Sequence, residues 1–230
     1  MQREILEKIK AARNHKRPVV LITNLDSGAQ GLCYVDGEMF GEWLSDEHRV
    51  MVDKVMREDK CQTFSTSAGN LFLQVFNPPL RMIIVGAVHI AQALVHLAEI
   101  CGYEVTLVDP RSAFGNDARF SGVHLVNEWP DKALKANPPD CRTAIVTLAH
   151  DPKLDDPALE VALGSDAFYI GSLGSRKTQA AREKRLIEKG FTKETLARIQ
   201  GPIGLDIGGR SPAEIAISIM AEVTQTLRKA

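Results

Sequence analysis

Apolar and polar positions along residues 81–228 alternate between two periodicities. Short continuous apolar runs are typical of parallel strands buried on both faces of a sheet. Between them lie longer stretches whose apolar residues recur every three or four positions, which indicates amphipathic helices. The runs predict strands at 81–86, 103–109, 123–126, 143–148 and 167–171, and the stretches predict helices at 90–101, 155–164, 176–189, 192–198 and 211–228. Alternating strands and helices predict an α/β fold with a Rossmann-like, doubly wound parallel sheet.

The residues before this region have a more mixed pattern. The predicted elements there are helices at 3–13 and 46–58, strands at 18–23 and 71–76, and a hairpin turn at Asp36-Gly37. Asn77-Pro78-Pro79 then breaks regular structure. We therefore predict a small N-terminal α+β domain at residues 1–79 and a Rossmann-like domain at residues 80–230.

The first strand, turn and helix of the second domain carry most of a dinucleotide-binding motif. Gly86 and Ala91 hold the first and third positions of Gly-x-Gly-x-x-Gly/Ala, and Asp109 lies 23 residues after Gly86, near the expected spacing. Val88 stands where the second glycine normally lets the backbone approach a pyrophosphate. The motif therefore predicts the fold strongly, and an ordinary dinucleotide ligand only weakly.

Polar clusters follow the predicted strands, where open α/β sheets bind their ligands. Helix N-termini at this edge also attract anions, because their first N–H groups have no partner within the helix. We therefore expect an anionic ligand here. The candidate binding residues are Gly86, Ala87, Val88, His89, Asp109, Arg111, His150, Asp151, Ser172, Gly174, Ser175 and Arg176, and residues 204–212 before the last helix form a further candidate segment.

Each candidate also has a purely structural interpretation. Asp109 could simply terminate a strand, and His89 could pack or cap in the first turn of its helix. His150 and Asp151 could form a helix-entry turn before Pro152, and the serines could be surface caps. Outside the clusters, we interpret Arg182, Lys184 and Arg185 as a solvated helix face, and Trp43 and Trp129 as packing residues.

Composition narrows the class of protein. The chain has 230 residues, 44% hydrophobic and 25% charged, as in ordinary soluble globular proteins. Its net charge of -1 gives no general attraction to nucleic acid or to an anionic membrane. The charged N-terminus is unlike a signal peptide, and no apolar run reaches transmembrane length. The four scattered cysteines, Cys33, Cys61, Cys101 and Cys141, are interpreted as buried, reduced thiols in a cytoplasmic protein, and no metal-binding or catalytic-triad motif is present.

Seven segments stand together in an ordered set over residues 81–228. They are Gly86-Ala-Val-His-Ile-Ala91, Val108-Asp-Pro-Arg111, Arg119-Phe120, His150-Asp-Pro-Lys153, Tyr169-Ile-Gly-Ser-Leu-Gly-Ser-Arg176, Gly204-Leu-Asp-Ile-Gly208 and Ser211-Pro-Ala-Glu-Ile215. The set resembles the XdhC/CoxI family of xanthine dehydrogenase accessory proteins. Two N-terminal segments of that family, Gly-Ser-x-Pro-Arg and Gly-Gly-Gly-Cys-x-Glu, are not found in residues 1–79, where Cys33 is the nearest local feature. The chain thus resembles a divergent or short-form member.

The resemblance implies a factor that binds molybdenum cofactor (molybdopterin), supports its sulfuration with a cysteine desulfurase, and helps insert it into an apo molybdenum hydroxylase such as xanthine dehydrogenase. It implies a homodimer, with neither a nucleic acid nor a membrane as partner. Arg176 and helix N-termini would hold the phosphate, Asp109 and Asp151 would accept pterin N–H groups, and His89 or Arg111 would face the metal-oxo end. Two alternatives stay open at this point: an NAD(P)-dependent oxidoreductase, favoured by Asp109, and a nucleotide-sensing Rossmann regulatory protein.

Overall fold

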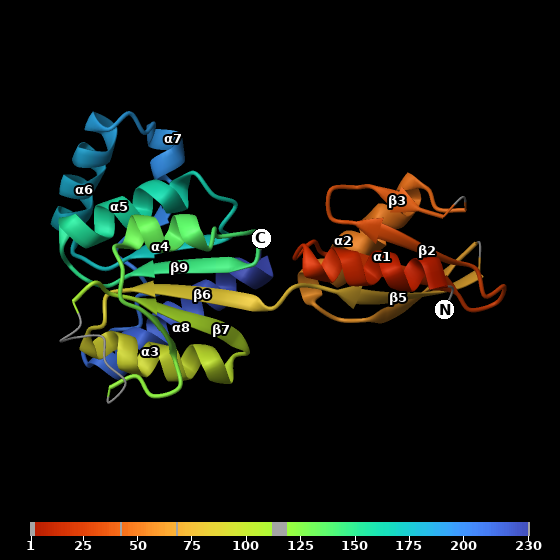
Figure 1. The fold of residues 1–230 in the computed structure, drawn as a ribbon, viewed down its shortest axis with the longest axis horizontal. Coiled ribbons are helices and arrows are strands. Elements are labelled where there is room, and N and C mark those ends of the chain that lie inside the picture. The colour runs from red at the N-terminus through yellow and green to blue at the C-terminus, as the bar shows by residue number, and fades with distance from the viewer. Residues whose placement is uncertain (1–2, 42, 68, 112–118, 230) are drawn as a thin grey trace. The chain divides into compact units, whose positions relative to one another are not determined.

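The computed structural model describes residues 3–41, 43–67, 69–111 and 119–229, and the chain divides into two compact units, residues 1–78 and 79–230. The first unit is a five-stranded antiparallel sheet in the order β3-β2-β1-β5-β4, with helices on its faces (Figure 1). Its elements are α1 (Arg3–Asn14), β1 (Val19–Asn24), β2 (Gln30–Tyr34), β3 (Met39–Phe40), a 3-10 turn η1 (Asp46–His48), α2 (Arg49–Glu58), β4 (Gln62–Thr66) and β5 (Gly69–Phe76).

Alternation along β1 explains why this sheet carries helices on both faces. Val19 and Leu21 pack with α1, while Val20 and Ile22 pack with α2. Successive side chains of a strand point to opposite faces, so a strand that is apolar throughout needs cover on both sides. The hairpin predicted at Asp36-Gly37 joins β2 to β3, and Gly37 adopts the positive φ of 86° that such a turn requires. β4 was not predicted, because its residues are largely polar and half exposed.

The second unit contains a six-stranded parallel sheet in the order β11-β10-β9-β6-β7-β8. The chain builds outward from β6 to β8 and then returns to β9 on the other side of β6, which is the Rossmann order. This confirms the predicted fold class. The elements are β6 (Leu80–Val85), α3 (His89–Ile100), β7 (Tyr103–Val108), β8 (His124–Val126), α4 (Pro130–Ala136), β9 (Thr143–Thr147), α5 (Pro152–Leu163), β10 (Tyr169–Ser172), α6 (Arg176–Glu188), α7 (Lys193–Leu196), β11 (Ile199–Gln200) and α8 (Pro212–Lys229).

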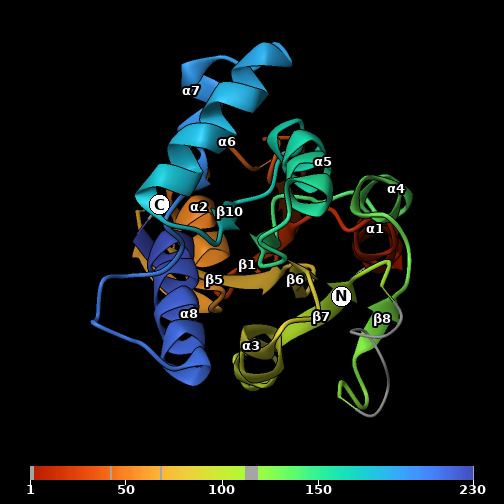
Figure 2. The ribbon, with the colours of Figure 1, turned by 90° about the vertical axis from the view of Figure 1, so that its left-hand side faces the viewer.

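Two apolar clusters cover the two faces of this sheet. Residues of α3 and α8 form one cluster with the sheet, and residues of α4 and α5 contribute to the other. Figure 2, which views the carboxyl edge of the sheet, shows the two helix layers on either side of it. The central strands β6 and β9 are buried throughout, as continuous apolar runs require. The helices that directly follow these two strands, α3 and α5, begin at the carboxyl edge of the sheet.

Two local differences from the predicted elements have clear causes. α4 was not predicted, since its seven residues span too few turns to show a periodicity. It begins with Pro130 directly after Trp129, and Pro138 and Pro139 prevent its continuation. The helix predicted at 192–198 is shorter, because β11 begins at Ile199 and pairs with β10. None of the helices in the described residues combines the length and apolar character needed to cross a membrane.

Candidate functional site

Gly86 marks the point where the strand order of the parallel sheet reverses. Its φ is 108°, and a Cβ added there would lie 2.6 Å from the backbone nitrogen of Ala149 and 2.8 Å from its Cα. Ala149 follows β9, so the turns after β6 and β9 touch backbone to backbone. A glycine is required at position 86 because any side chain would push these two turns apart. The first glycine of the motif thus shapes the crevice itself.

Asp109, after β7, is completely buried. Its carboxylate accepts hydrogen bonds from the backbone nitrogen of Ala87 at 2.8 Å, and from the backbone and guanidinium of Arg111 at 2.8–2.9 Å. Burial raises the pKa of Asp109, but the hydrogen bonds from Arg111 and the Ala87 N–H outweigh it and hold the pKa below its ordinary value. Asp109 is therefore an ionised clamp that fixes the Gly86–Ala87 turn and orients Arg111.

The rest of the first turn is held from both sides. The carbonyl oxygen of Ala87 accepts a hydrogen bond from Arg119 at 3.2 Å. Val88 is the N-cap residue of α3, and its half-buried side chain packs against the apolar cluster on that face. His89 is the first helical residue and is exposed. Of these residues, His89 presents its side chain to solvent at the carboxyl edge.

The turn after β9 combines an exposed histidine with a helix cap. His150 has a φ of 59°, which is uncommon for a residue other than glycine, and it is exposed. Asp151 is the N-cap of α5 and accepts a hydrogen bond from the Lys153 backbone nitrogen at 2.9 Å. The predicted helix-entry turn is present, and it leaves the His150 ring facing solvent.

The segment after β10 has a buried half and an exposed half. The hydroxyl of Ser172 is fully buried and lies 2.5 Å from that of Thr147 at the end of β9. Gly174 has a φ of 147°, and Ser175 caps α6 by accepting from the Thr178 backbone nitrogen at 3.2 Å. Arg176 is the first residue of α6 and is exposed. Ser172 therefore joins two strands, while Ser175 and Arg176 lie at the surface.

Sequence reasoning missed Asp155 in the first turn of α5. Its side chain is 2% exposed, and its Oδ1 atom has no hydrogen-bond partner among the described residues. Burial raises its pKa to about 6, although Arg182 and the backbone N–H groups of Ala149 and His150 favour the anion. The available signal was an aspartate one turn before Leu159, in the apolar stripe of the helix. Such a strongly perturbed group often marks a functional region.

The predicted solvated face of α6 is corrected by the structure. Arg182 is 2% exposed, and it donates to Gln179 Oε1 at 2.6 Å and to the carbonyl oxygen of Leu173 at 2.9 Å. Arg185 donates two hydrogen bonds to the buried Asp156, at 2.6 and 2.9 Å. Lys184 alone of the three is exposed as predicted. The reason is that Gln179, Arg182 and Leu186 fall on one stripe of the helix, and this stripe is buried.

Two other predictions concern packing residues and thiols. Trp43 is partly buried and packs as predicted, but Trp129 is 45% exposed, because it stands at the N-cap of the short helix α4. Cys33 is buried in β2 as predicted, and burial raises the pKa of its thiol, so it is a poor nucleophile or metal ligand. The prediction of burial is wrong for Cys61, Cys101 and Cys141, which are exposed. Among the described residues, no group of three or more His, Cys, Asp or Glu side chains could hold a metal ion.

The structure therefore sorts the candidate residues into two groups at one edge of the sheet. Gly86, Ala87, Asp109 and Ser172 shape the backbone from within. The surface carries His89, His150, Ser175 and Arg176, with Arg111 half-buried beside them. The N-termini of α3, α5 and α6 open at the same edge, where the positive ends of the helix dipoles favour an anion. The exposed set consists of donors and titratable rings, which suits a ligand with phosphate or metal-oxo oxygens.

Comparison with known proteins agrees with this arrangement. Residues 82–223 match the family described as the XdhC Rossmann domain. The chain is 27% identical over 229 residues to a probable xanthine dehydrogenase subunit from Bacillus subtilis (strain 168), covering 99% of this chain and 66% of that protein. It is 30% identical over 148 residues to the molybdenum cofactor insertion chaperone PaoD of Escherichia coli (strain K12), covering 64% of this chain and 40% of the chaperone.

A solved structure shares the whole fold. The crystal structure of a xanthine dehydrogenase from Bacillus halodurans matches 99% of this chain and 65% of its own, with a TM-score of 0.68 and 23% identity. The chain thus spans at most about two thirds of the length of these relatives. Because the family match covers most of the chain and includes every candidate residue, this protein belongs to the XdhC family through its Rossmann domain.

Proposed function

We propose that this protein is an accessory factor that binds molybdenum cofactor at the carboxyl edge of its parallel sheet and supports insertion of the cofactor into a molybdenum hydroxylase of the xanthine dehydrogenase type. The observation that carries the proposal is the set of exposed donors at the switch point, within a domain of the XdhC family. The name of the chaperone PaoD supports cofactor insertion as the role. The name of the Bacillus subtilis relative supports a xanthine dehydrogenase as the client.

The chemistry of the donor set fits this cofactor. Arg176 and the N-terminus of α6 would hold the phosphate, and Asp151 would accept hydrogen bonds from pterin N–H groups. His89, His150 and Arg111 would face the oxo groups at the metal end. The cofactor supplies the metal-centred chemistry of the client hydroxylase, while this chain's residues would bind it and orient it.

The burial and hydrogen bonding of Asp109 favour a ligand other than a dinucleotide. In a Rossmann enzyme the acidic residue after the second strand hydrogen-bonds a ribose hydroxyl. Here the carboxylate is sealed from solvent and already accepts four hydrogen bonds. We propose that Asp109 acts on the ligand indirectly, by presenting Arg111. This arrangement offers no carboxylate to a ribose and argues against an NAD(P)-dependent activity.

Further steps are part of the same proposal. Family membership supports sulfuration of the bound cofactor by a cysteine desulfurase, and a homodimer as the assembly. The four cysteines carry free thiols, which supports action in the reducing environment of the cytoplasm. Co-purification with a desulfurase and light scattering of the full chain would test the partner and the dimer.

The most direct test of the ligand class is native mass spectrometry of the gently purified full chain. We expect a molybdopterin species close to one per chain, and no bound NAD or NADP. A chain that retains a dinucleotide and no pterin would overturn the proposal. Purification from a host that cannot make the cofactor gives the control, since the molybdopterin mass must then disappear.

A further inference from the structure

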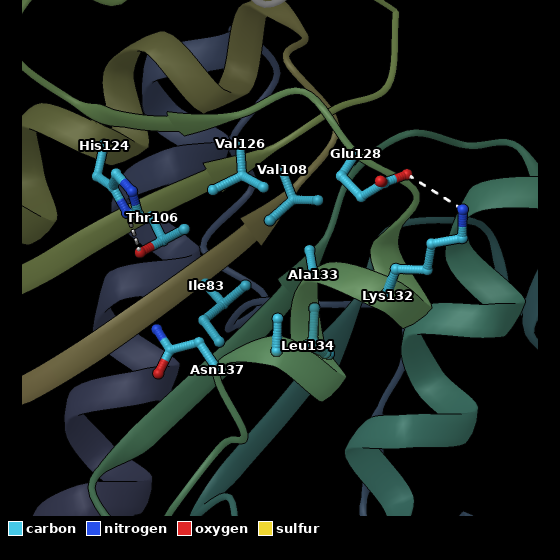
Figure 3. A pocket seen from close by; sticks show the side chains of 11 residues that line it. Ile83, Thr106, Val108, His124, Val126, Glu128, Lys132, Ala133, Leu134 and Asn137 are labelled. Atoms are coloured by element: carbon cyan, nitrogen blue, oxygen red, sulfur yellow. Dashed lines mark hydrogen bonds and ion pairs between the residues drawn. The ribbon is translucent and has the colours of Figure 1, made fainter.

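The Rossmann unit has a pocket that is lined by none of the residues of the proposed cofactor site. It lies between helix α4 and the face of strands β6, β7 and β8, and its volume is about 320 Å³ (Figure 3). This is at the lower end of the range of about 300–1,000 Å³ typical of small-molecule sites. Its floor is apolar and buried, formed by Ile83 and Val108, which are 3% and 1% exposed, and by Leu134 of α4.

The sequence explains why the chain does not fill this space itself. α4 has seven residues and cannot extend past Asn137, because Pro138 and Pro139 follow. On the helix side the pocket is lined by Ala133 and Ala136, each of which has only a methyl group as its side chain. A flat, β-branched sheet surface therefore faces small helix residues across a slot.

Polar side chains stand at both ends of the slot. Figure 3 shows Thr106 and His124 at one end, where Oγ1 and Nδ1 lie 3.4 Å apart. Glu128 and Lys132 stand at the other end, with their charged atoms 3.7 Å apart. The amide of Asn137 also lines the pocket and offers both a donor and an acceptor. Each end thus combines donor and acceptor groups, and the carboxylate and ammonium at the second end balance each other.

We propose that this pocket binds an uncharged, flat nitrogen heterocycle of one or two fused rings, with hydrogen-bonding atoms at both ends of its long axis. The apolar floor and the alanine wall would contact the two ring faces. The end groups would pair with ring nitrogens and exocyclic substituents, as polar groups at the rim of ligand pockets do. The balanced charge at the Glu128–Lys132 end disfavours a phosphate or carboxylate there. This site is independent of the proposed cofactor function.

Adenine is a suitable probe, and Trp129 is a suitable reporter because it adjoins Glu128 and is 45% exposed. The protein has two tryptophans, so Trp43→Phe in the full chain leaves the Trp129 signal alone. We expect adenine to change Trp129 fluorescence saturably, with one site per chain. Ala133→Leu, which fills the slot, should weaken adenine binding at least about tenfold. Far-UV circular dichroism and a thermal melt of each variant establish that it is folded.

His124→Ala offers a second variant that leaves the packed floor intact, with His96→Ala at an exposed position of α3 as its matched control. We expect the first to weaken adenine binding several-fold and the second to leave it unchanged. Three results would overturn the proposal: no saturable binding at millimolar adenine, equal binding by wild type and a folded Ala133→Leu variant, or a wild-type dimer that Ala133→Leu dissociates. The last would assign this face to a second copy of the chain.

Discussion

At the scale of single residues, two buried aspartates at the carboxyl edge differ in how far hydrogen bonds offset the burial of their charge. Asp109 accepts four hydrogen bonds, and its pKa is lowered. Its contribution to stability is therefore present above the ordinary pKa and is lost as the pH falls through the lower, folded value. Asp155 has an unpaired oxygen, and burial raises its pKa to about 6. The ionised form of Asp155 therefore destabilises the folded state. Natural proteins tend to retain such destabilising buried charges near functional sites.

We predict that Asp155→Asn stabilises the protein at pH 7.5. Between the ordinary aspartate pKa of 3.8 and the folded pKa of about 6, the folded state binds more protons, so the free energy of unfolding falls as the pH rises through this window. Above it the full cost of the buried anion applies, about 3 kcal/mol. Chemical denaturation should show the gain at pH 7.5 and its loss near pH 4.

The neighbouring Asp156→Asn is the matched control, because Asp156 is also buried but accepts two hydrogen bonds from Arg185. It should destabilise the protein at pH 7.5 by about 1–3 kcal/mol. Equal effects of the two substitutions would show that the unpaired oxygen of Asp155 is not what sets its cost.

Arg176→Ala should weaken binding of molybdenum cofactor about tenfold without changing the thermal melt. Arg176 is exposed at the start of α6, where a charged hydrogen bond to a phosphate would be made and no core contact is lost. Lys184→Ala removes an exposed charge farther along the same helix and serves as the control. If both variants bind like wild type, the phosphate lies elsewhere.

At the scale of elements, periodicity predicted the larger helices and strands because each carries a long apolar stripe or run. α4 and β4 lacked such a signal: the first is too short, and the second is largely polar. The edge at which the candidate residues gather was predictable, since topology alone brings strand ends together. The burial of these residues was not predictable. Asp109 is paired with Arg111, and Arg182 points into the protein, because of side-chain geometry that sequence spacing does not encode.

The contact between the turns after β6 and β9 gives a prediction at this scale. Gly86→Ala should destabilise the protein by about 3 kcal/mol or more, through the strain of a positive φ and a clash with the Ala149 backbone. Gly102→Ala, at a φ of 83° with nothing within 4 Å of the added Cβ, isolates the strain and should cost only about 1 kcal/mol. Urea denaturation of both variants measures the difference, and similar costs would show that the turns can separate freely.

At the scale of the whole molecule, the family match lies within the Rossmann unit, and the N-terminal unit lies outside it. The chain spans about two thirds of the Bacillus subtilis relative. In the first unit Cys33 is buried and Cys61 is exposed, and neither lies within the residues that match the family. We therefore assign ligand binding to the second unit.

The central claim is that the switch point of this sheet binds molybdenum cofactor and not a dinucleotide. An anaerobic equilibrium titration of the full chain, with isolated molybdenum cofactor in one series and NAD or NADP in the other, tests it most directly. The account predicts saturation by the cofactor at about one per chain, weakened in Arg176→Ala, and at least about a hundredfold weaker binding of either dinucleotide. Tight binding of NAD or NADP, with no saturable binding of the cofactor, would contradict it.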